Sequence, residues 1–557
     1  MNIVILLGMI FSAVAYFMYA RNMIHMFQLN SYKTKVQIKW YREHFGRLAA
    51  GTVLLIYTLV LFALSFTELL NKKGTALGAV ILLAVLAGAL CIASRPRQAK
   101  KPLVYTTRIK RLFVTVSVFM VAALAVDTVR ILSCGMAELP DFNGSISIVP
   151  ISPMAAGLTP MLILLGNLIN RPVENAVRNH YVREAKDMLK SSPELEIIGI
   201  TGSFGKTSVK YYLSTLLKAG YNVLMTPESF NTPLGVVRTV REQLKPTHNM
   251  FICEMGARNV GDIKELCDLV HPHSGVITSV GEQHLESFKT IDNIVNTKFE
   301  LENSLPEDGM IFLNGDNELI KKRIADGKLM AGRKYVTYGL DSSNDYFAYD
   351  IVTDINGTTF TVGRNGIPER ELAAFGESVQ SAPVQFHTKL IGSHNVLNIV
   401  GAIAVANTYG ILLDKLVPQV RKLESVPHRL QLIKRPGITI IDDAYNSNPA
   451  GAAAALETLG MMEGCRIIVT PGMVELGEKA EELNGDLGTK AAAACDYIIC
   501  VGSLNGETIA NGARKAGFPE SRLHVVQTLN EAMNIAYGIS TDQAKIILLE
   551  NDLTDNY

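Results

Sequence analysis

The sequence predicts an α-helical membrane domain followed by two α/β domains with mostly parallel sheets. Long apolar stretches are confined to the first 170 residues, and short apolar runs alternate with helical patterns after residue 190. This alternation is typical of βαβ units, and it restarts near Pro427. We therefore expect a membrane domain at 1–170, a basic connector at 171–190, a central domain at 191–426 and a C-terminal domain at 427–557.

The composition excludes several classes of protein. Of the 557 residues, 48% are hydrophobic and 19% are charged, which is too apolar for a disordered chain. The formal net charge is +1, so no overall positive field favours nucleic acid as a partner. The seven cysteines include no Cys-x-x-Cys pair, so we expect reduced thiols rather than disulfides or a zinc site.

Five N-terminal stretches are long enough to cross a bilayer, which takes about 20 apolar residues. The first lacks the basic start and the cleavage site of a signal peptide, so we interpret it as an anchor. The last contains several prolines and should be kinked or split, because each proline removes a backbone donor. The five stretches are 3–20, 48–70, 76–94, 112–134 and 146–169.

Charged residues in the loops predict the orientation. The loops at 21–47 and 95–111 are rich in Lys and Arg, whereas the loop at 135–145 has neither. Basic loops stay in the cytoplasm, so the N-terminus should lie outside and the α/β domains inside. In the fourth stretch, Asp127 and Arg130 are expected to form an ion pair near the helix end, although charged pairs inside membranes can be functional.

Nine short apolar runs in the α/β part are predicted to be strands. The stretches 349–352 and 358–362 flank Asn356-Gly357, which is typical of a β-hairpin turn. The nine runs are 197–200, 250–253, 275–280, 310–313, 438–441, 467–470, 497–501, 523–526 and 545–549.

A glycine-rich loop between the first of these strands and a helix predicts a phosphate site. Glycines let backbone amides approach phosphate oxygens, and the N-terminus of the helix favours an anion. Lys206 should reach the outer phosphates of ATP, and the Thr207 hydroxyl should ligate Mg²⁺. The candidate residues of the loop are Gly202, Ser203, Gly205, Lys206, Thr207 and Ser208.

The same loop resembles the nucleotide loop of the Mur ligases, the ATP-dependent amide ligases of peptidoglycan precursor synthesis. Further motifs follow in the order of that family over about residues 195–550, and the stretch 254–257 is similar to the branch that adds D-alanyl-D-alanine. The resemblance implies a P-loop central domain, a Rossmann-like C-terminal domain and a bacterial source. The motifs lie at 229–235, 254–257, 261–263, 284–288, 314–316, 392–398, 428–430, 442–449 and 472–477.

The resemblance also implies catalytic and metal-binding residues. In the family, ATP phosphorylates a substrate carboxylate, and an amine then attacks the acyl phosphate. Glu254 and His284 match residues that hold a second metal ion, which makes Thr207, Glu254 and His284 the expected metal ligands. Lys298 matches a lysine that is often carbamylated, so Lys206, His284 and Lys298 are the expected catalytic residues. The alternatives are a core or surface histidine and an ordinary surface lysine.

Nucleotide contacts farther along the chain follow from the same resemblance. Asn398, Arg429 and Asp443 match positions that hold the adenine, a phosphate and the ribose. The alternative for Asn398 is an amide on a helix surface. Glu475 is left as a substrate contact only.

Two departures from the family pattern bear on the substrate. The family's N-terminal domain, which grips a uridine-nucleotide sugar, has no counterpart here, and an acidic terminus at 548–557 replaces a basic Lys-Gly-Ser-Arg-like stretch. We expect a multi-pass protein of the bacterial membrane that ligates an amino acid or peptide amine to a carboxylate acceptor at the bilayer, such as a lipid-linked envelope intermediate. A poly-γ-glutamate or capsule-type amide synthase, a nucleotide-driven transporter and an inactive scaffold are the alternatives.

Overall fold

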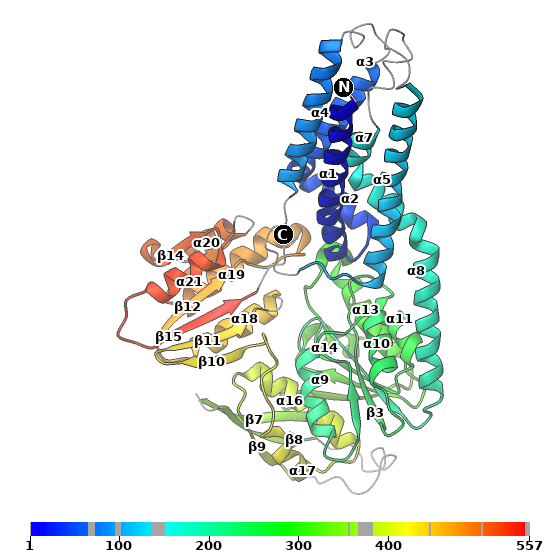
Figure 1. Cartoon of the computed structure of the whole chain (residues 1–557). Coiled ribbons are helices and arrows are strands. Elements are labelled where there is room, and N and C mark those ends of the chain that lie inside the picture. The colour runs from blue at the N-terminus through cyan, green and yellow to red at the C-terminus, as the bar shows by residue number, and fades with distance from the viewer. Residues whose placement is uncertain are drawn as a thin grey trace. The chain divides into compact units, whose positions relative to one another are not determined.

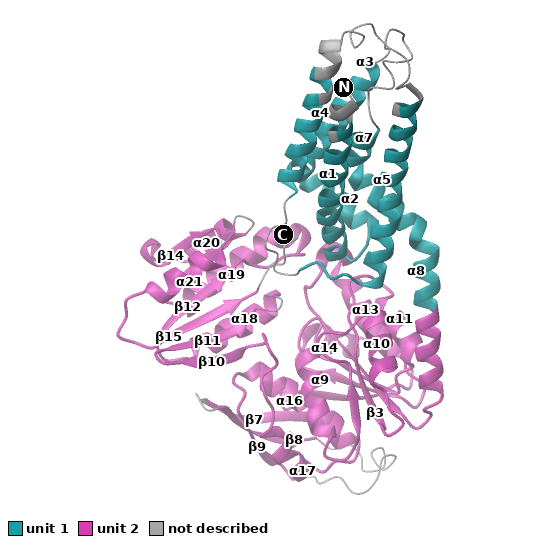
Figure 2. Ribbon diagram, viewed as in Figure 1, with its two compact units in different colours: residues 1–179, 554–557 teal, residues 180–553 magenta. Residues whose placement is uncertain are grey.

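The chain forms two compact units in the computed structural model, residues 1–179 and residues 180–553 (Figure 2). The structure describes residues 2–64, 73–94, 102–134, 151–354, 357–365, 382–444, 447–502 and 505–551. The division falls within helix α8 (Thr159–Lys190).

The first unit is helical (Figure 1). Its helices enclose a core of large apolar side chains. Tyr16 and Phe27, Leu54, Leu83 and Met120 belong to this core and come from four different helices. The helices are α1 (Asn2–Leu29), α2 (Thr34–Glu43), α3 (Phe45–Leu64), α4 (Lys73–Ala93), α5 (Thr107–Cys134), α7 (Ser152–Gly157) and the beginning of α8.

Helices occupy the described parts of all five predicted membrane stretches; residues 65–70 and 146–150 lie outside the described residues. In the part of the chain that the structure describes, two helices are long and apolar enough to cross a membrane, Phe45–Leu64 and Thr107–Arg130. The apolar stretch Ile81–Ala93, which is part of α4, is shorter. The core helix of a soluble protein can have the same length and composition, so the membrane crossing stays a prediction.

The fifth stretch is split, as predicted from its prolines. Helix α7 ends at Gly157 and α8 begins at Thr159, with Pro153 and Pro160 each in the first turn of its helix. Asp127 is buried, and its carboxylate accepts hydrogen bonds from the backbone N–H groups of Ile151 (2.6 Å) and Ser152 (2.9 Å). Asp127 therefore caps the start of α7.

The second unit contains two sheets, and we call the parts that carry them the central and the C-terminal domain. The central sheet has the order β2-β3-β1-β4-β5-β6-β7-β8-β9, and its neighbours are parallel from β2 to β7 and antiparallel from β7 to β9. The antiparallel pair β7–β8 confirms the predicted hairpin, whose residues 355 and 356 lie outside the described residues. The strands are β1 (Glu196–Thr201), β2 (Val223–Met225), β3 (Met250–Glu254), β4 (Ser274–Ile277), β5 (Met310–Asn314), β6 (Lys334–Gly339), β7 (Tyr346–Asp354), β8 (Gly357–Arg364) and β9 (Val384–Thr388).

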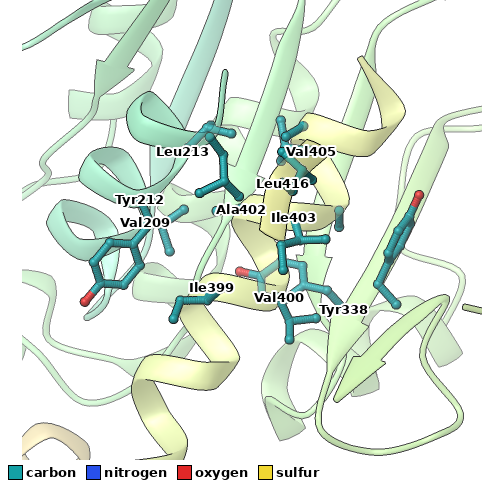
Figure 3. Close-up of a cluster of buried hydrophobic side chains, with 14 of the residues drawn as sticks. Val209, Tyr212, Leu213, Tyr338, Ile399, Val400, Ala402, Ile403, Val405 and Leu416 are labelled. Carbon is teal, nitrogen blue, oxygen red and sulfur yellow. The ribbon is translucent and has the colours of Figure 1, made fainter. Parts of the chain in front are cut away.

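Helices cover both faces of this sheet. On one face α9 and α16 pack over Ile198 and Ile252. Figure 3 shows the side chains that these helices contribute, such as Leu213 and Ile403. On the other face α10, α11 and α13 pack over Ile197 and Phe251. Strands buried on both faces are continuous apolar runs, which is why these strands could be predicted. The helices are α9 (Lys206–Leu217), α10 (Pro233–Gln243), α11 (Asp262–Val270), α12 (Leu285–Phe288), α13 (Ile291–Asn303), α14 (Glu318–Ala325), α16 (Ser393–Thr408) and α17 (Leu413–Val420).

The C-terminal sheet has the order β10-β11-β15-β12-β13-β14 and is parallel except for β10. The strands are β10 (Gln431–Arg435), β11 (Ile438–Asp443), β12 (Cys465–Thr470), β13 (Tyr497–Val501), β14 (Leu523–Val526) and β15 (Lys545–Glu550). The helices are α18 (Pro449–Gly460), α19 (Ala480–Ala494), α20 (Gly506–Lys515) and α21 (Leu529–Gly538), with short 3₁₀ turns η3 (Gly477–Lys479) and η4 (Glu520–Arg522).

Candidate functional site

The glycine-rich loop lies at the carboxyl edge of the central sheet, where ligands bind in parallel α/β sheets. It joins the end of β1 to the first residue of α9, Lys206. A Cβ on Gly202 would lie 2.1 Å from Thr278 Oγ1, and Gly205 has a φ of 81°. Only glycine fits both positions, so the backbone of the loop stays open to an anion.

Lys206 folds across this loop. Its Nζ donates to the carbonyl oxygens of Gly202 (2.6 Å) and Ser203 (3.1 Å). Burial lowers the pKa of Lys206 to about 8, although the charge of Glu254 opposes this shift. The segment after β4 fixes the loop, because Ser203 Oγ donates to the Gly281 carbonyl oxygen at 3.0 Å. Lys206 is therefore placed to contact the phosphates of a bound nucleotide.

Glu254, at the end of β3, connects the surrounding polar groups. Its Oε1 accepts from Thr207 Oγ1 (3.1 Å) and Asn231 Nδ2 (3.2 Å), and its Oε2 lies 3.0 Å from Lys210 Nζ. Burial favours a raised pKa for Glu254, but Lys210 and Lys206 outweigh it and lower the pKa. A carboxylate beside a hydroxyl supplies the oxygen ligands that Mg²⁺ prefers, so Thr207 and Glu254 fit this ion.

Lys210 is a site residue that the sequence analysis missed. Its side chain is 0% exposed, and its Nζ also donates to the carbonyl oxygen of Glu228. Residues three and four apart share one face of a helix, so the spacing of Lys210 from Lys206 and Thr207 could have indicated it.

Lys298, on α13, is buried at 2% exposure. Burial, together with repulsion from Lys206, lowers its pKa well below the ordinary value, against the opposing charges of Asp262 and Glu300. The alternative of an ordinary surface lysine is therefore excluded. A neutral amine is the form that reacts with carbon dioxide, so the environment suits a carbamate, which stays a prediction.

His284 was expected to hold a metal ion together with Thr207 and Glu254, but in the structure its ring contacts Glu475. It has a φ of 54° just before α12, and its Nδ1 contacts a carboxylate oxygen of Glu475, from the C-terminal domain. Glu475 also lies 3.4 Å from Arg258 Nη1. Within the described ranges, no three His, Cys, Asp or Glu side chains are grouped to hold a metal. The structure thus brings Thr207 and Glu254 together and pairs His284 with Glu475, so the role of His284 as a metal ligand stays a prediction.

The three predicted nucleotide contacts lie near the loop or near one another. Asn398 faces the loop, since its Oδ1 is 2.8 Å from where a Cβ on Gly205 would lie. Arg429 is close enough to lower the pKa of Lys206. Burial raises the pKa of Asp443 to about 6, and Arg429 opposes this rise. Asn398 is therefore more than a helix-surface amide, while the assignments to adenine and ribose remain predictions. Ser208 lies in the first turn of α9.

Glu550, in the acidic terminus, lies inside the C-terminal domain. It is 1% exposed, and its carboxylate accepts hydrogen bonds from the hydroxyls of Ser447 and Thr470, the latter at 2.9 Å. Burial raises its pKa to about 7. This carboxylate therefore has its hydrogen-bond partners inside the domain.

Comparison with known proteins finds matches to both α/β domains. Residues 200–406 match the Mur ligase middle domain, and residues 428–550 match the Mur ligase glutamate ligase domain. A relative named UDP-N-acetylmuramoyl-tripeptide–D-alanyl-D-alanine ligase, from Bacillus subtilis, is 31% identical over 362 residues, which cover 62% of this chain and 74% of the relative. The protein of the same name from Escherichia coli is 27% identical over 345 residues, with 60% and 72% coverage.

Solved structures share the fold of the same region. MurF from Acinetobacter baumannii has a TM-score of 0.59 at 24% identity, with 67% of this chain and 77% of that one covered. The MurF ligase from Thermotoga maritima in complex with ADP has a TM-score of 0.57 at 22% identity, with 67% and 80% covered. At these identities the likeness shows the fold alone.

Proposed function

The chain belongs to the Mur ligase family and is an ATP-dependent ligase that works with Mg²⁺, and we propose that it joins an amine to a carboxylate acceptor held at the bacterial cell membrane. The observation that carries the ligase chemistry is the group formed by Lys206, Thr207 and Glu254 at the end of the glycine-rich loop. These side chains place an ammonium group, a hydroxyl and a carboxylate at the loop where the phosphates of ATP would bind.

The chemistry requires activation of the acceptor carboxylate. A carboxylate oxygen attacks the γ-phosphorus of ATP, the bond to the bridging oxygen of ADP breaks, and an acyl phosphate forms. The amine then attacks the acyl carbon, loses a proton, and phosphate leaves. Phosphoryl transfer depends mostly on positioning and charge neutralisation. Lys206 supplies a positive charge at the phosphates, and Mg²⁺ held by Thr207 and Glu254 adds charge neutralisation when bound.

Membrane anchoring is supported by the first unit. Two of its described helices are long and apolar enough to span a bilayer. Large apolar side chains are also exposed on its helices, among them Val53, Ile56, Val118 and Val121. The basic loops at 21–47 and 95–111 favour an N-terminus outside the cell and ligase domains in the cytoplasm, where ATP is available.

The proposed acceptor follows from the helices that precede the matched region. By their names, the relatives ligate D-alanyl-D-alanine to a UDP-N-acetylmuramoyl-tripeptide. We propose that the present acceptor is a lipid-linked carboxylate of the cell envelope, and that the amine comes from an amino acid or short peptide. Support comes from the apolar helices that precede the matched region, because they would hold the ligase domains beside such an acceptor.

The test is ATP hydrolysis by the purified full chain with candidate amines and membrane lipid extract, followed by mass spectrometry of the lipids. The proposal expects ATP consumption that depends on both substrates and a lipid whose mass increases by the amine minus water. Lys206→Ala should abolish this turnover, because it removes a charge at the phosphates. Lys218→Ala, an exposed lysine after α9, is the matched control. Turnover by Lys206→Ala would contradict the site, and a ladder of products would identify a polyamide synthase.

A further inference from the structure

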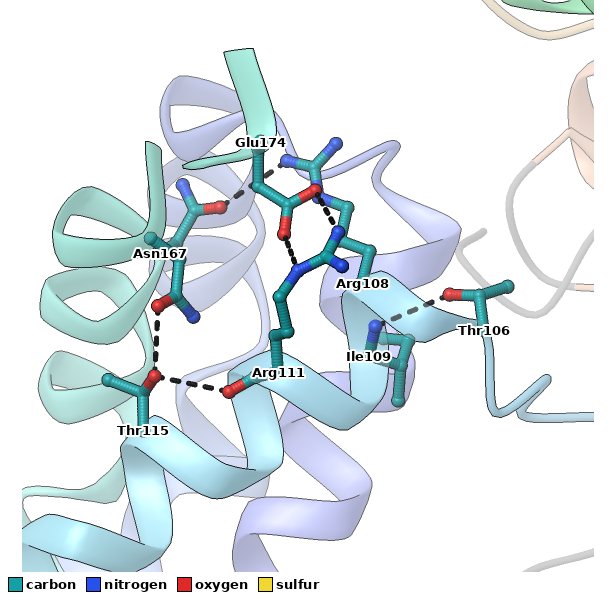
Figure 4. Close-up of polar contacts among 8 residues, drawn as sticks. Thr106, Arg108, Ile109, Arg111, Thr115, Asn167 and Glu174 are labelled. Atoms are coloured by element: carbon teal, nitrogen blue, oxygen red, sulfur yellow. Dashed lines mark hydrogen bonds and ion pairs between the residues drawn. The ribbon is translucent and has the colours of Figure 1, made fainter. Parts of the chain in front are cut away.

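A cationic cluster lies where helices α5 and α8 meet in the first unit (Figure 4). Arg108 and Arg111 stand at the beginning of α5, and Glu174 stands on α8. Arg111 donates to both carboxylate oxygens of Glu174, at 2.7 and 2.9 Å, whereas Arg108 Nε lies 4.0 Å from the same carboxylate. Two guanidinium groups therefore share one carboxylate, and these three side chains carry a net positive charge.

The amide side chains of the cluster present donors to their surroundings. Arg108 Nη2 donates to Oδ1 of Asn167 (3.4 Å). Thr115 Oγ1 lies 2.9 Å from Oδ1 of Asn170 and 3.1 Å from the carbonyl oxygen of Arg111, and its single proton serves one of these two acceptors (Figure 4). Because a guanidinium has no acceptor, the amide oxygen of Asn167 faces it and the NH₂ group points elsewhere. Asn167 and Asn170 are three residues apart and share one face of α8. Each of these amides has two N–H groups, so at least one N–H of each is turned away from Arg108 or Thr115 and suits an anion.

The cluster is fixed in place but open to ligands. The guanidinium carbon of Arg108 lies 3.9 Å from the ring centroid of Tyr32, while the Arg108 side chain is 35% exposed. Helices α5 and α8 approach closely here, since a Cβ on Gly166 would lie 3.3 Å from side-chain atoms of Leu112 and Val116. A site held this rigidly loses little freedom when it binds.

Apolar surface adjoins the charged groups. The stretch Thr107–Arg130 is apolar enough to span a membrane, and Arg108 and Arg111 are at its start. On α8, Leu165, Leu168 and Ile169 are exposed beside the two asparagines. Basic residues at the end of a membrane helix lie at the level of the lipid head groups.

We infer that this cluster binds the phosphate group of a membrane lipid, with Arg108 and the two amides donating to the phosphate oxygens and the lipid chain lying along α8. The inference rests on the proposed membrane anchoring. A phosphate or diphosphate ester is the group by which a lipid would be held at the first unit. A polyprenyl diphosphate carrier and an anionic phospholipid both offer this group, so the experiment must distinguish them.

Native mass spectrometry of the full chain in detergent would test the site, with polyprenyl diphosphate, phosphatidylglycerol and inorganic diphosphate as separate probes. Arg108→Gln should weaken binding of the lipid phosphate about tenfold, the worth of one charge-assisted contact. Lys110→Gln removes the same charge two residues away, from an exposed side chain, and should change binding less than about twofold. If Arg108→Gln fails to fold, Asn170→Ala tests the same face.

Preference for polyprenyl diphosphate would make the site an acceptor site, and preference for phosphatidylglycerol would make it a site for a bulk lipid; both support a lipid phosphate. Equal effects of the two variants, no effect of Arg108→Gln, or equally tight binding of inorganic diphosphate would overturn the inference. If the full chain forms a lipid-linked amide but Arg108→Gln binds the lipid as tightly as the unaltered chain, the lipid site at this cluster is refuted and the proposed function stands. If lipid binding depends on Arg108 but no amide product forms, the lipid site stands and the proposed function is refuted.

Discussion

Replacing Lys210 with methionine should destabilise the second unit and weaken nucleotide binding together. Lys210 Nζ lies 3.0 Å from Glu254 Oε2, and the two side chains are 0% and 1% exposed. Methionine fills similar space without a charge, so Glu254 would remain buried with less compensation. Loss of one partner from a buried ion pair costs about 3–5 kcal/mol of unfolding free energy. We expect about 3 kcal/mol, since Lys206, Thr207 and Asn231 still face Glu254.

The loss should depend on pH in a defined direction. Lys210 and Lys206 lower the pKa of Glu254 in the folded chain despite its burial. Such a carboxylate adds stability above its unfolded pKa of about 4.3. That contribution disappears as the pH falls through the folded value. The deficit of Lys210→Met should therefore be full at pH 7 and should shrink below about pH 4.

Scanning calorimetry of the full chain in detergent measures this effect. A loss of about 3 kcal/mol should lower the melting temperature of the second unit by about 4 °C at pH 7. Lys218→Met makes the same chemical change on an exposed residue after α9 and should leave the melting temperature nearly unchanged. Lys210→Met combined with Glu254→Gln should regain part of the stability, because the buried charge is gone. Equal melting temperatures for Lys210→Met and Lys218→Met would refute the reasoning.

Three further predictions concern single positions. Lys298→Ala should lose ligase activity, and a short carboxylic acid in the buffer should restore part of it, because a carbamate and a carboxylate present the same two oxygens; rescue by alkylamines alone would contradict the carbamate. Asp443→Asn should raise the free energy of unfolding by about 2 kcal/mol at pH 8 and by less at pH 5. Burial raises the pKa of Asp443 to about 6, so its charged form opposes folding at the higher pH. Melting curves that shift equally at both pH values would contradict this prediction. In a cysteine-free chain, a membrane-impermeant thiol reagent should label a cysteine at position 140 and spare one at position 190, and the reverse pattern would overturn the orientation.

The sequence predicts most strands inside the two sheets and misses three of the four edge strands. All nine predicted strands are present, because a strand covered on both faces is a continuous apolar run. Strands β2, β9 and β10 were missed, and they lie at the edges of their sheets, where less apolar surface is buried; the fourth edge strand, β14, was predicted. Strand β6 was also missed, and its first two residues are exposed.

The candidate site divides in the same way between local and distant contacts. The glycine-rich loop could be recognised because its residues are consecutive. The spacing of Lys210 from Lys206 and Thr207 indicates that it faces the loop, but its pairing with Glu254 could not be recognised, because Glu254 stands on strand β3, far away in the sequence. The contact between His284 and Glu475 joins two domains, and neither motif by itself indicates it.

The close approach of Asn398 makes position 205 intolerant of any residue but glycine, for two separate reasons. Any side chain at position 205 would strain the backbone and also displace the amide of Asn398. A smaller residue in place of Asn398 on α16 would remove the second obstacle and leave the backbone strain, so it could not by itself rescue a substitution at position 205. Among homologues of this chain, position 205 should therefore stay glycine even where position 398 has changed.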